Sequence, residues 1–481
     1  MRKYILFILI LCLFSSSCED LLEEETFGEL REDEVDRLIE EAGVVGVGFS
    51  FLASGYASNR LLDRAFAAYI HAPSLMTGEV DGSGGTWEFS VSNPFEEYSW
   101  DLDQFMINQV YNRQYAAISN CNRVTDLITV TSDSLSTTIL GQAHALRGYS
   151  YWMLYDYFGR LIISESRPNA NIIDQSRATL EETQAQIESD LRIGADLIPE
   201  ASSRLGVMSK GGALGILTRF YLNEKRWADA ANTALEVMDL GAFSLDNDFG
   251  SIFKQTSEGS QEILWGIPYQ VNNANEATIL GALTLPPGIL LQGGQGNLPA
   301  HLRVPADFVE SFADGDVRQN EYPREYPNGS GGTSTLPDGF HACLKYGQDP
   351  GANGAAGGID HIVVRYADIL LMRAEALNEL NGPNQESIDL INQVRTRSNA
   401  PELSLSNFSS TEQLRDAILQ ERAWEFHFEG LRRRDLIRHG KLVSDALARG
   451  KANAEDFRLL FPLPSAEIDN NPSVNENNPG Y

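Results

Sequence analysis

Residues 210–241 read KGGALGILTRFYLNEKRWADAANTALEVMDLG. Apolar residues at helical spacing predict one helix over Ala213–Leu222 and a second over Trp227–Leu240, joined by a polar turn. Small residues in the second helix allow a neighbouring helix to approach closely: Ala228, Ala230, Ala231 and Ala234. A helix–turn–helix unit of about 34 residues with this spacing is typical of a tetratricopeptide-type repeat. The stretch therefore predicts an all-α scaffold built from helical pairs.

Helical periodicity continues on both sides of this unit, and on the C-terminal side it again comes in pairs. The helix dense in aromatic rings, from Tyr149 to Phe158, is expected to lie in the core. We expect about four tetratricopeptide-like pairs that stack into a superhelix. The further predicted helices span Ala143–Phe158, Leu180–Leu197, Tyr366–Leu380, Gln385–Arg397, Leu414–Phe428 and Leu431–Leu442.

Three segments interrupt the helical pattern, at 78–100, 266–300 and 322–360, and they are rich in Gly, Pro, Ser or Asn. They are too long to be simple turns. Long irregular segments inside a compact domain are usually functional, because a rigid scaffold can present variable loops to a ligand. We therefore expect the helices to form the scaffold and these insertions to determine ligand specificity.

The first residues predict how the chain is targeted. Arg2 and Lys3 precede an apolar run over 5–14, which is about half of the roughly 20 residues that a membrane-spanning helix needs. Three serines then lead to Cys18. This pattern predicts a lipoprotein signal peptide over 1–17, lipidation of Cys18 and a flexible acidic tether over 18–30. An ordinary secretory signal that happens to contain this cysteine is the alternative.

Composition excludes several classes of function. The 481 residues carry a formal net charge of -30, which argues against nucleic-acid binding and disfavours polyanionic substrates. Cys121 and Cys343 have no neighbouring CxxC or Cys/His cluster, so a zinc site is not expected. The two cysteines are interpreted as buried free thiols, with a single bridge between them as the alternative.

Charged motifs in the C-terminal half are interpreted as structural. The cluster Glu421, Arg422, Glu425, Glu429, Arg432 and Asp435 has the spacing of ion pairs on adjacent helices. Asp314-Gly-Asp316-Val-Arg318 lacks the further ligands of a calcium loop and is interpreted as a turn. No nucleophile motif, phosphate loop or dinucleotide fingerprint occurs. The sequence predicts no enzyme activity, no cofactor and no metal site.

Aromatic residues outside the helices indicate a binding surface. The C–H face of a sugar ring suits the negative face of an aromatic ring, and sugar hydroxyls pair with planar polar groups such as Asn and Asp. Rings that are interleaved with such residues occur in two of the irregular segments. The predicted glycan-binding residues are Asp81, Trp87, Phe89, Tyr98, Trp100, Trp265, Tyr269 and Asn273.

Several stretches, taken in order along the chain, resemble the SusD/RagB family of surface nutrient-binding lipoproteins. Arg365–Ala376 resembles the family's fourth repeat, and Glu421–Gly440 resembles its penultimate helix pair. The similarity covers essentially the whole chain after the signal peptide. The other stretches that carry it are Gln142–Tyr149, Ser209–Ala213, Phe461–Pro472 and Asn477–Tyr481.

The resemblance implies a SusD-like fold with an N-terminal region over 31–265 and a C-terminal region over 266–481. It implies an outer-membrane lipoprotein on the cell surface that captures oligosaccharides and delivers them to a SusC-like TonB-dependent transporter. In this interpretation the helical face contacts the transporter and the aromatic loops face the ligand, without catalysis.

Three alternatives remain open. RagB-like peptide capture would favour backbone pairing and apolar pockets. A surface glycoside hydrolase would need two carboxylates about 5–10 Å apart, whereas the loops offer only scattered acids. A purely structural interaction module is the third, because helical repeats usually bind proteins, although the aromatic loops argue against it.

Overall fold

The computed structural model describes the chain in segments, from residue 46 to the C-terminus. Within them, the chain from Gly48 to Tyr481 forms one unit, to which the following description applies. The described residues are 46, 48, 50–53, 73–82, 93–128, 134–164, 175–202, 206–254, 259–271, 277–298 and 302–481.

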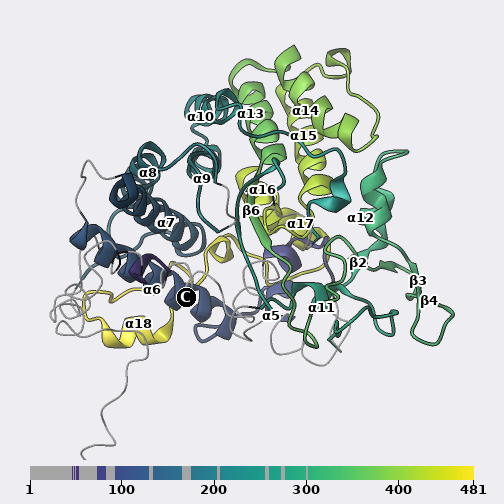
Figure 1. The fold of residues 1–481 in the computed structure, drawn as a ribbon, viewed down its shortest axis with the longest axis horizontal. Helices are drawn as coiled ribbons and strands as arrows, with labels where there is room; N and C mark the ends of the chain where they lie inside the picture. Colours follow the sequence, from purple (N-terminus) through teal and green to yellow (C-terminus); the bar gives the residue numbers. More distant parts are fainter. Residues whose placement is uncertain are drawn as a thin grey trace, which may run out of the picture. The chain divides into compact units, whose positions relative to one another are not determined.

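The first half of the scaffold is a row of long helices in which each helix packs on the next (Figure 1). This arrangement confirms the predicted helical scaffold. The unit quoted from the sequence forms the pair α9 and α10, and the tetratricopeptide-like superhelix stays a prediction. The helices are α6 (Phe105–Leu127), α7 (Ser134–Phe158), α8 (Leu180–Leu197), α9 (Lys210–Asn223) and α10 (Trp227–Asp239).

The second half continues the row, because α10 packs on α13 and α13 packs on both α14 and α15. The predicted helix Leu414–Phe428 is too long: α15 ends at Glu425, and Phe428 and Gly430 have positive φ angles of 66° and 76°. The predicted Leu431–Leu442 helix is likewise wrong, since it is two short helices separated at Gly440. These helices are α13 (Tyr366–Asn381), α14 (Gln385–Arg397), α15 (Thr411–Glu425), α16 (Arg432–Arg438) and α17 (Leu442–Ala448).

Local chemistry sets where several helices begin. Thr179 and Glu182 form a reciprocal capping box at α8: Glu182 N donates to Thr179 Oγ1 at 3.1 Å, and Thr179 N donates to Glu182 Oε2 at 2.8 Å. Ser209 caps α9 and Asn384 caps α14 by accepting backbone N–H groups. Such caps satisfy donors that a helix start would otherwise leave unpaired.

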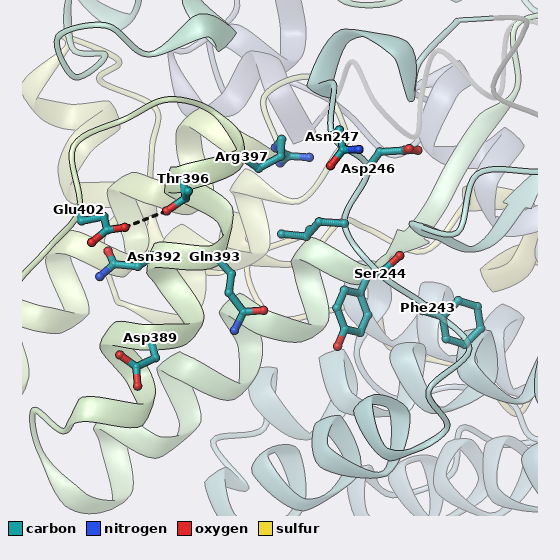
Figure 2. A pocket seen from close by; sticks show the side chains of 12 residues that line it. Phe243, Ser244, Asp246, Asn247, Asp389, Asn392, Gln393, Thr396, Arg397 and Glu402 are labelled. Carbon is teal, nitrogen blue, oxygen red and sulfur yellow. Dashed lines mark hydrogen bonds between the residues drawn. The ribbon is translucent and has the colours of Figure 1, made fainter.

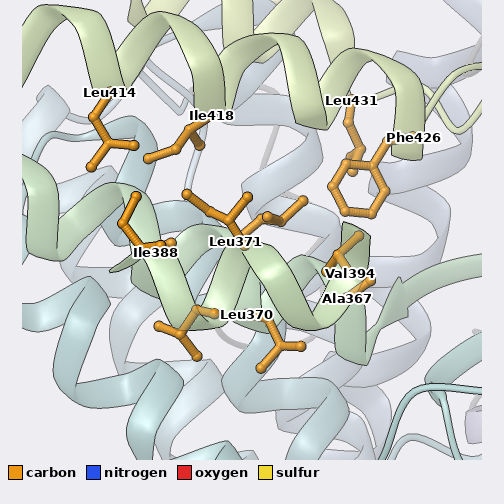
Figure 3. Close-up of a cluster of buried hydrophobic side chains, with 12 residues drawn as sticks. Ala367, Leu370, Leu371, Ile388, Val394, Leu414, Ile418, Phe426 and Leu431 are labelled. Atoms are coloured by element: carbon orange, nitrogen blue, oxygen red, sulfur yellow. The ribbon is translucent and has the colours of Figure 1, made fainter. Parts of the chain in front are cut away.

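Helices α13, α14 and α15 enclose one hydrophobic core (Figure 3). Leu371, Ile391, Val394 and Ile418 are fully buried there. Burying side chains of this kind contributes about 1.5–3 kcal/mol each. The ring-rich helix is also core, as predicted, since Tyr149, Tyr151, Trp152, Tyr157 and Phe158 are all buried.

Two glycines allow close packing where a side chain would collide. A Cβ atom on Gly148 of α7 would lie 2.8 Å from Leu191 Cγ of α8, and one on Gly211 of α9 would lie 2.3 Å from the Phe243 ring. Since real Cβ contacts of this length essentially never occur, glycine at these positions sets the spacing of α7 against α8 and of α9 against the segment that follows α10.

The described residues contain three short antiparallel strand pairs. Strand β1 (Ile263–Ile267) pairs with β6 (His361–Arg365), and every residue of both strands is buried. The other pairs are β2 (Val304–Pro305) with β5 (Phe340–His341) and β3 (Glu325–Pro327) with β4 (Thr333–Thr335). The short α-helices are α5 (Asn93–Glu96), α11 (Leu280–Thr284), α12 (Ala306–Glu310) and α18 (Ser465–Asn470).

Cys121 and Cys343 are buried free thiols, as expected from the sequence. Burial raises the pKa of each thiol to about 12, so neither is a reactive thiolate. Within the described ranges, no helix is both long enough and apolar enough to cross a membrane.

Candidate functional site

Two of the predicted ligand-stacking rings belong to the core. Tyr98 and Trp100 are 0% and 3% exposed, and the Trp100 ring meets Phe461 edge-on with centroids 5.0 Å apart. The hydroxyl of Tyr98 donates to the carbonyl of Met76 at 2.8 Å. The prediction that these two rings form an open platform is therefore wrong. Residues 93–100 fold back onto the C-terminal segment and supply apolar area to it.

Trp265 and Tyr269 were also expected on a ligand-facing loop, and their rings are likewise buried. Trp265 lies in strand β1 and packs edge-on against Tyr149 of α7, with centroids 4.8 Å apart. Tyr269 is 5% exposed, and its backbone N–H donates to Asp360 Oδ1 at 2.7 Å. Residues 263–267 form strand β1 and not a loop, because they pair with β6, almost one hundred residues away in the chain. This pairing places the stretch in the core.

Asp81 lies at the base of an irregular segment and is held by Arg303. The Asp81 Oδ1 to Arg303 guanidinium distance is 2.6 Å, and the two backbones exchange hydrogen bonds of 2.8 and 2.9 Å. The guanidinium of Arg303 also lies over the Phe340 ring, 3.9 Å from its centroid. Arg303 and Phe340 were missed from the sequence, because no local pattern links residues that are so far apart.

The remaining predicted residues lie outside the described part of the chain: Trp87, Phe89, Asn273 and the lipidation site Cys18. The described residues on either side of segment 299–301 hydrogen-bond to one helix, α11. Leu298 N donates to Ala282 O at 3.2 Å, and Leu302 N donates to Leu283 O at 2.8 Å. The next residue, Arg303, pairs with Asp81.

Described residues next to three segments therefore lie at or near α11: Asp81 before 83–92, Ala277 after 272–276, and Leu298 and Leu302 on either side of 299–301. Ala277, which follows the second segment, lies three residues before the start of α11, and the bridge of Thr278 to Gly357 fixes that end. Binding residues are often carried on connecting segments that a rigid scaffold positions.

The described part of the chain also contains a polar cavity of about 860 Å³, which is lined mostly by residues of α14 and of the segment that follows α10. One wall is the face of α14 that carries Asp389, Asn392, Gln393 and Thr396 (Figure 2). The opposite wall is the segment 243–247, which follows α10. The residues that line the cavity were not singled out from the sequence, because polar residues on a helix face ordinarily indicate only contact with solvent.

The charged cluster of the C-terminal half belongs to a buried ion-pair network and is structural, as interpreted, but the predicted pairing between adjacent helices is mostly wrong. Among the described residues, only Arg422 and Asp435 of the cluster pair with each other, at 2.9 Å. Glu425 pairs with Arg318 at 2.7 Å and with Arg365 at 2.5 Å, and also pairs with Arg397. Burial alone would raise the pKa of Glu425, but Arg397, Arg365 and Arg318 hold it well below its ordinary value. Most partners come from distant segments, so the network joins α15 to β6, α14 and the turn at Asp316.

The turn Asp314–Arg318 is structural as well. Both carboxylate oxygens of Asp316 accept from the Arg318 guanidinium, at 2.7–3.2 Å, and Arg318 is fully buried. No group of three or more His, Cys, Asp or Glu side chains that could hold a metal ion occurs among the residues with described positions.

Two family models match the chain, and they match different parts of it. Residues 72–222 match a family described as starch-binding associating with outer membrane, and residues 318–481 match the SusD family. Together they cover well over half of the chain. The chain is a member of the SusD/RagB-like family.

Curated relatives match this SusD/RagB-like chain over most or all of its length. SusD-like protein P2 of Formosa agariphila is 24% identical over 524 residues, which cover 100% of both chains. The starch-binding protein SusD of Bacteroides thetaiotaomicron is 22% identical over 454 residues, which cover 80% of each.

Solved structures show the same SusD-like fold. A SusD homolog from Bacteroides thetaiotaomicron superimposes with a TM-score of 0.77 at 24% identity, covering 91% of this chain and 97% of the other. Surface glycan-binding protein A from the same organism, in complex with laminarihexaose, gives 0.75 at 18% identity, covering 90% and 98%. A laminarin-binding SusD-like protein gives 0.74 at 20% identity, covering 90% and 99%.

Proposed function

We propose that this SusD/RagB-like chain is a surface glycan-binding protein, and that it captures oligosaccharides through the segments anchored around α11. The shared anchoring of these segments is the observation that carries the proposal, because it gathers the chain ends that lead to Trp87, Phe89 and Asn273. Two proteins of similar fold are described as binding laminarin or laminarihexaose, which supports a glycan as the ligand class.

The proposal includes no catalytic step. Of the acids near these segments, Asp81 is paired with Arg303, and Glu79 is paired with Arg432 at 2.6 Å. A hydrolase needs one carboxylic acid and one carboxylate that both face the substrate. Ion pairing with arginine instead keeps these two side chains engaged with the scaffold. We therefore propose that ligand is bound by stacking and hydrogen bonds and then released unchanged.

We further propose that the protein is held at the outer membrane through lipidated Cys18 and delivers its ligand to a SusC-like TonB-dependent transporter. The description of the matching family, starch-binding associating with outer membrane, supports this location. Co-purification of a TonB-dependent transporter from detergent-solubilised outer membranes would support the partnership, and recovery of the chain without any such transporter would argue against it.

Isothermal titration with laminarihexaose and maltohexaose tests glycan capture. Trp87→Ala and Phe89→Ala should each weaken binding several-fold, because stacking contributes about 1 kcal/mol per ring. Phe105→Ala is the matched control: Phe105 is 47% exposed on α6, outside the irregular segments, so its loss should leave binding unchanged.

The same samples distinguish the alternatives. Shortened saccharides after incubation would support a hydrolase, whereas binding of unstructured peptides with no binding of either hexasaccharide would support peptide capture. Equal binding by wild type, Trp87→Ala and Phe89→Ala would place the glycan site away from these rings.

A further inference from the structure

The cavity between α14 and segment 243–247 has two walls that are fixed independently of any ligand. On one side, Asn392 Nδ2 donates to Leu403 O at 2.9 Å and Leu403 N donates to Asn392 Oδ1 at 2.8 Å. On the other, Ser244 N donates to Gln261 O at 3.1 Å and Asp246 N donates to Glu262 Oε2 at 2.8 Å. Because both walls are held by the scaffold, the cavity is preorganised.

Several polar groups in this cavity are not used by the scaffold. The side chains of Asn247 and Gln393 are exposed, and neither forms a hydrogen bond within the described ranges. Gln393 projects from α14 towards the side of the cavity that carries Ser244 (Figure 2). The hydroxyl of Tyr366, whose ring is half-buried at the cavity, also has no hydrogen-bond partner among described residues. The described lining of the cavity thus presents two amides and one phenol that are not hydrogen-bonded to other described residues.

The charge of the cavity restricts what it can hold. Among the described residues that line the cavity, Asp246, Asp389 and Glu402 contribute three carboxylates, and Arg397 contributes one guanidinium. The Arg397 guanidinium is already neutralised by Glu262, at 3.1 Å, and by Glu425. The local potential is therefore negative, which disfavours sulfated or uronic ligands. Carboxylates and free amides instead suit a ligand with many hydroxyl groups.

We propose that this cavity is a second saccharide-binding site, which takes a neutral oligosaccharide and is built from elements other than the α11 segments. A volume of about 860 Å³ lies within the range of about 300–1,000 Å³ that is usual for small-ligand sites. Asn247 and Gln393 pair with sugar hydroxyls, and the Tyr366 ring lies against the sugar C–H face. A basic peptide is the competing occupant, but the amides, which both donate and accept, favour hydroxyl groups.

The proposal is tested by hydrogen exchange and titration on the purified protein with neutral hexasaccharides: laminarihexaose, maltohexaose, cellohexaose and xylohexaose. At least one of them should slow exchange in peptides that cover 243–247 and 389–402. The double variant Asn247→Ala/Gln393→Ala should abolish that protection and weaken the corresponding binding at least about fivefold. Gln420→Ala, the same residue type on α15 outside the cavity, is the matched control.

Each outcome decides between the two sites. Protection that survives Trp87→Ala but not the double variant supports a second site. Loss of all saccharide binding in Trp87→Ala, with wild-type behaviour in the double variant, overturns the second site and leaves the proposed function intact. No protection at 243–247 by any of the four hexasaccharides also overturns it, as does stronger protection by an oligogalacturonate or by a lysine-rich peptide.

Discussion

The indole Nε1 of Trp100 donates a hydrogen bond of 2.8 Å to the phenolic oxygen of Tyr481, the last residue of the chain. Tyr481 in turn donates to the carbonyl of Leu460 at 2.9 Å. Asn478, three residues earlier, donates from Nδ2 to the carbonyls of Phe158, at the end of α7, and Phe461. The aromatic residues before α6 and the C-terminal tail thus close one layer over α7.

Trp100 should accordingly matter for stability. Trp100→Ala should lower the free energy of unfolding by about 3–5 kcal/mol, because it removes a large buried ring. Trp100→Phe, which keeps a ring and loses only the N–H donor, should cost less. Urea denaturation of the three proteins measures this. A Trp100→Ala variant that unfolds like wild type but binds glycan poorly would show that this ring contacts the ligand and does not stabilise the core.

Loss of the Glu425 carboxylate should lower the free energy of unfolding strongly. Glu425→Ala leaves Arg318, Arg365 and Arg397 without their shared carboxylate, and removal of one partner from a buried ion pair costs about 3–5 kcal/mol. Asp416→Ala, which breaks an exposed pair with Lys441, should cost about 0–1 kcal/mol. Chemical denaturation of both variants gives the comparison, and equal losses would contradict the central role of the network.

Stability should fall in acid partly because of two buried histidines. Burial lowers the pKa of His361 and of His427 from 6.5 to about 3. Below pH 6.5 these two histidines become protonated in the unfolded chain, whereas in the folded chain they stay neutral until about pH 3. The free energy of unfolding should therefore decrease between these pH values.

His427→Gln isolates one of these contributions. This substitution should reduce the slope of the free energy of unfolding against pH by up to about 1.4 kcal/mol per pH unit. Measurements at pH 8, where both states are neutral at this position, supply the variant's own stability as a reference. Identical pH profiles for wild type and variant would show that His427 does not contribute.

Anchoring depends on Cys18 in the proposed function. Cys18→Ala should leave the protein unprocessed or released from the membrane, because no thiol remains for the lipid at the predicted cleavage site. Cell fractionation and surface labelling of intact cells measure both effects. A variant that is still membrane-bound and labelled at the surface would show that another feature holds the protein there.

Several helix positions could be predicted closely from sequence because the signal is local, although α7 begins at Ser134 and not at the predicted Ala143. Both Leu180–Leu197 and Gln385–Arg397 were predicted with the bounds that the structure has. Apolar spacing and capping residues act within a few turns of the chain. The boundary errors near Gly430 and Gly440 arose where glycines with positive φ break an otherwise helical pattern.

The ligand rings could not be assigned in the same way. Trp265 and Tyr269 have loop-like sequence neighbours, yet β6 covers this stretch from almost one hundred residues away. Trp100 is covered by Phe461 and Tyr481, more than three hundred residues later. Whether a ring is exposed depends on which residues pack on it, and the composition of the neighbouring sequence does not specify those residues.

By itself, the sequence determined the helical scaffold, the burial of the ring-rich helix, the free thiols and the structural nature of the charged cluster, because each follows from local periodicity or from residue chemistry. Only the tertiary structure decided which aromatic rings are covered and which arginines Glu425 joins. It also decided that Leu298 and Leu302 hydrogen-bond to α11, and that α14 and segment 243–247 line a polar cavity that is open to solvent. These features depend on contacts between distant segments, which form only when the helices pack.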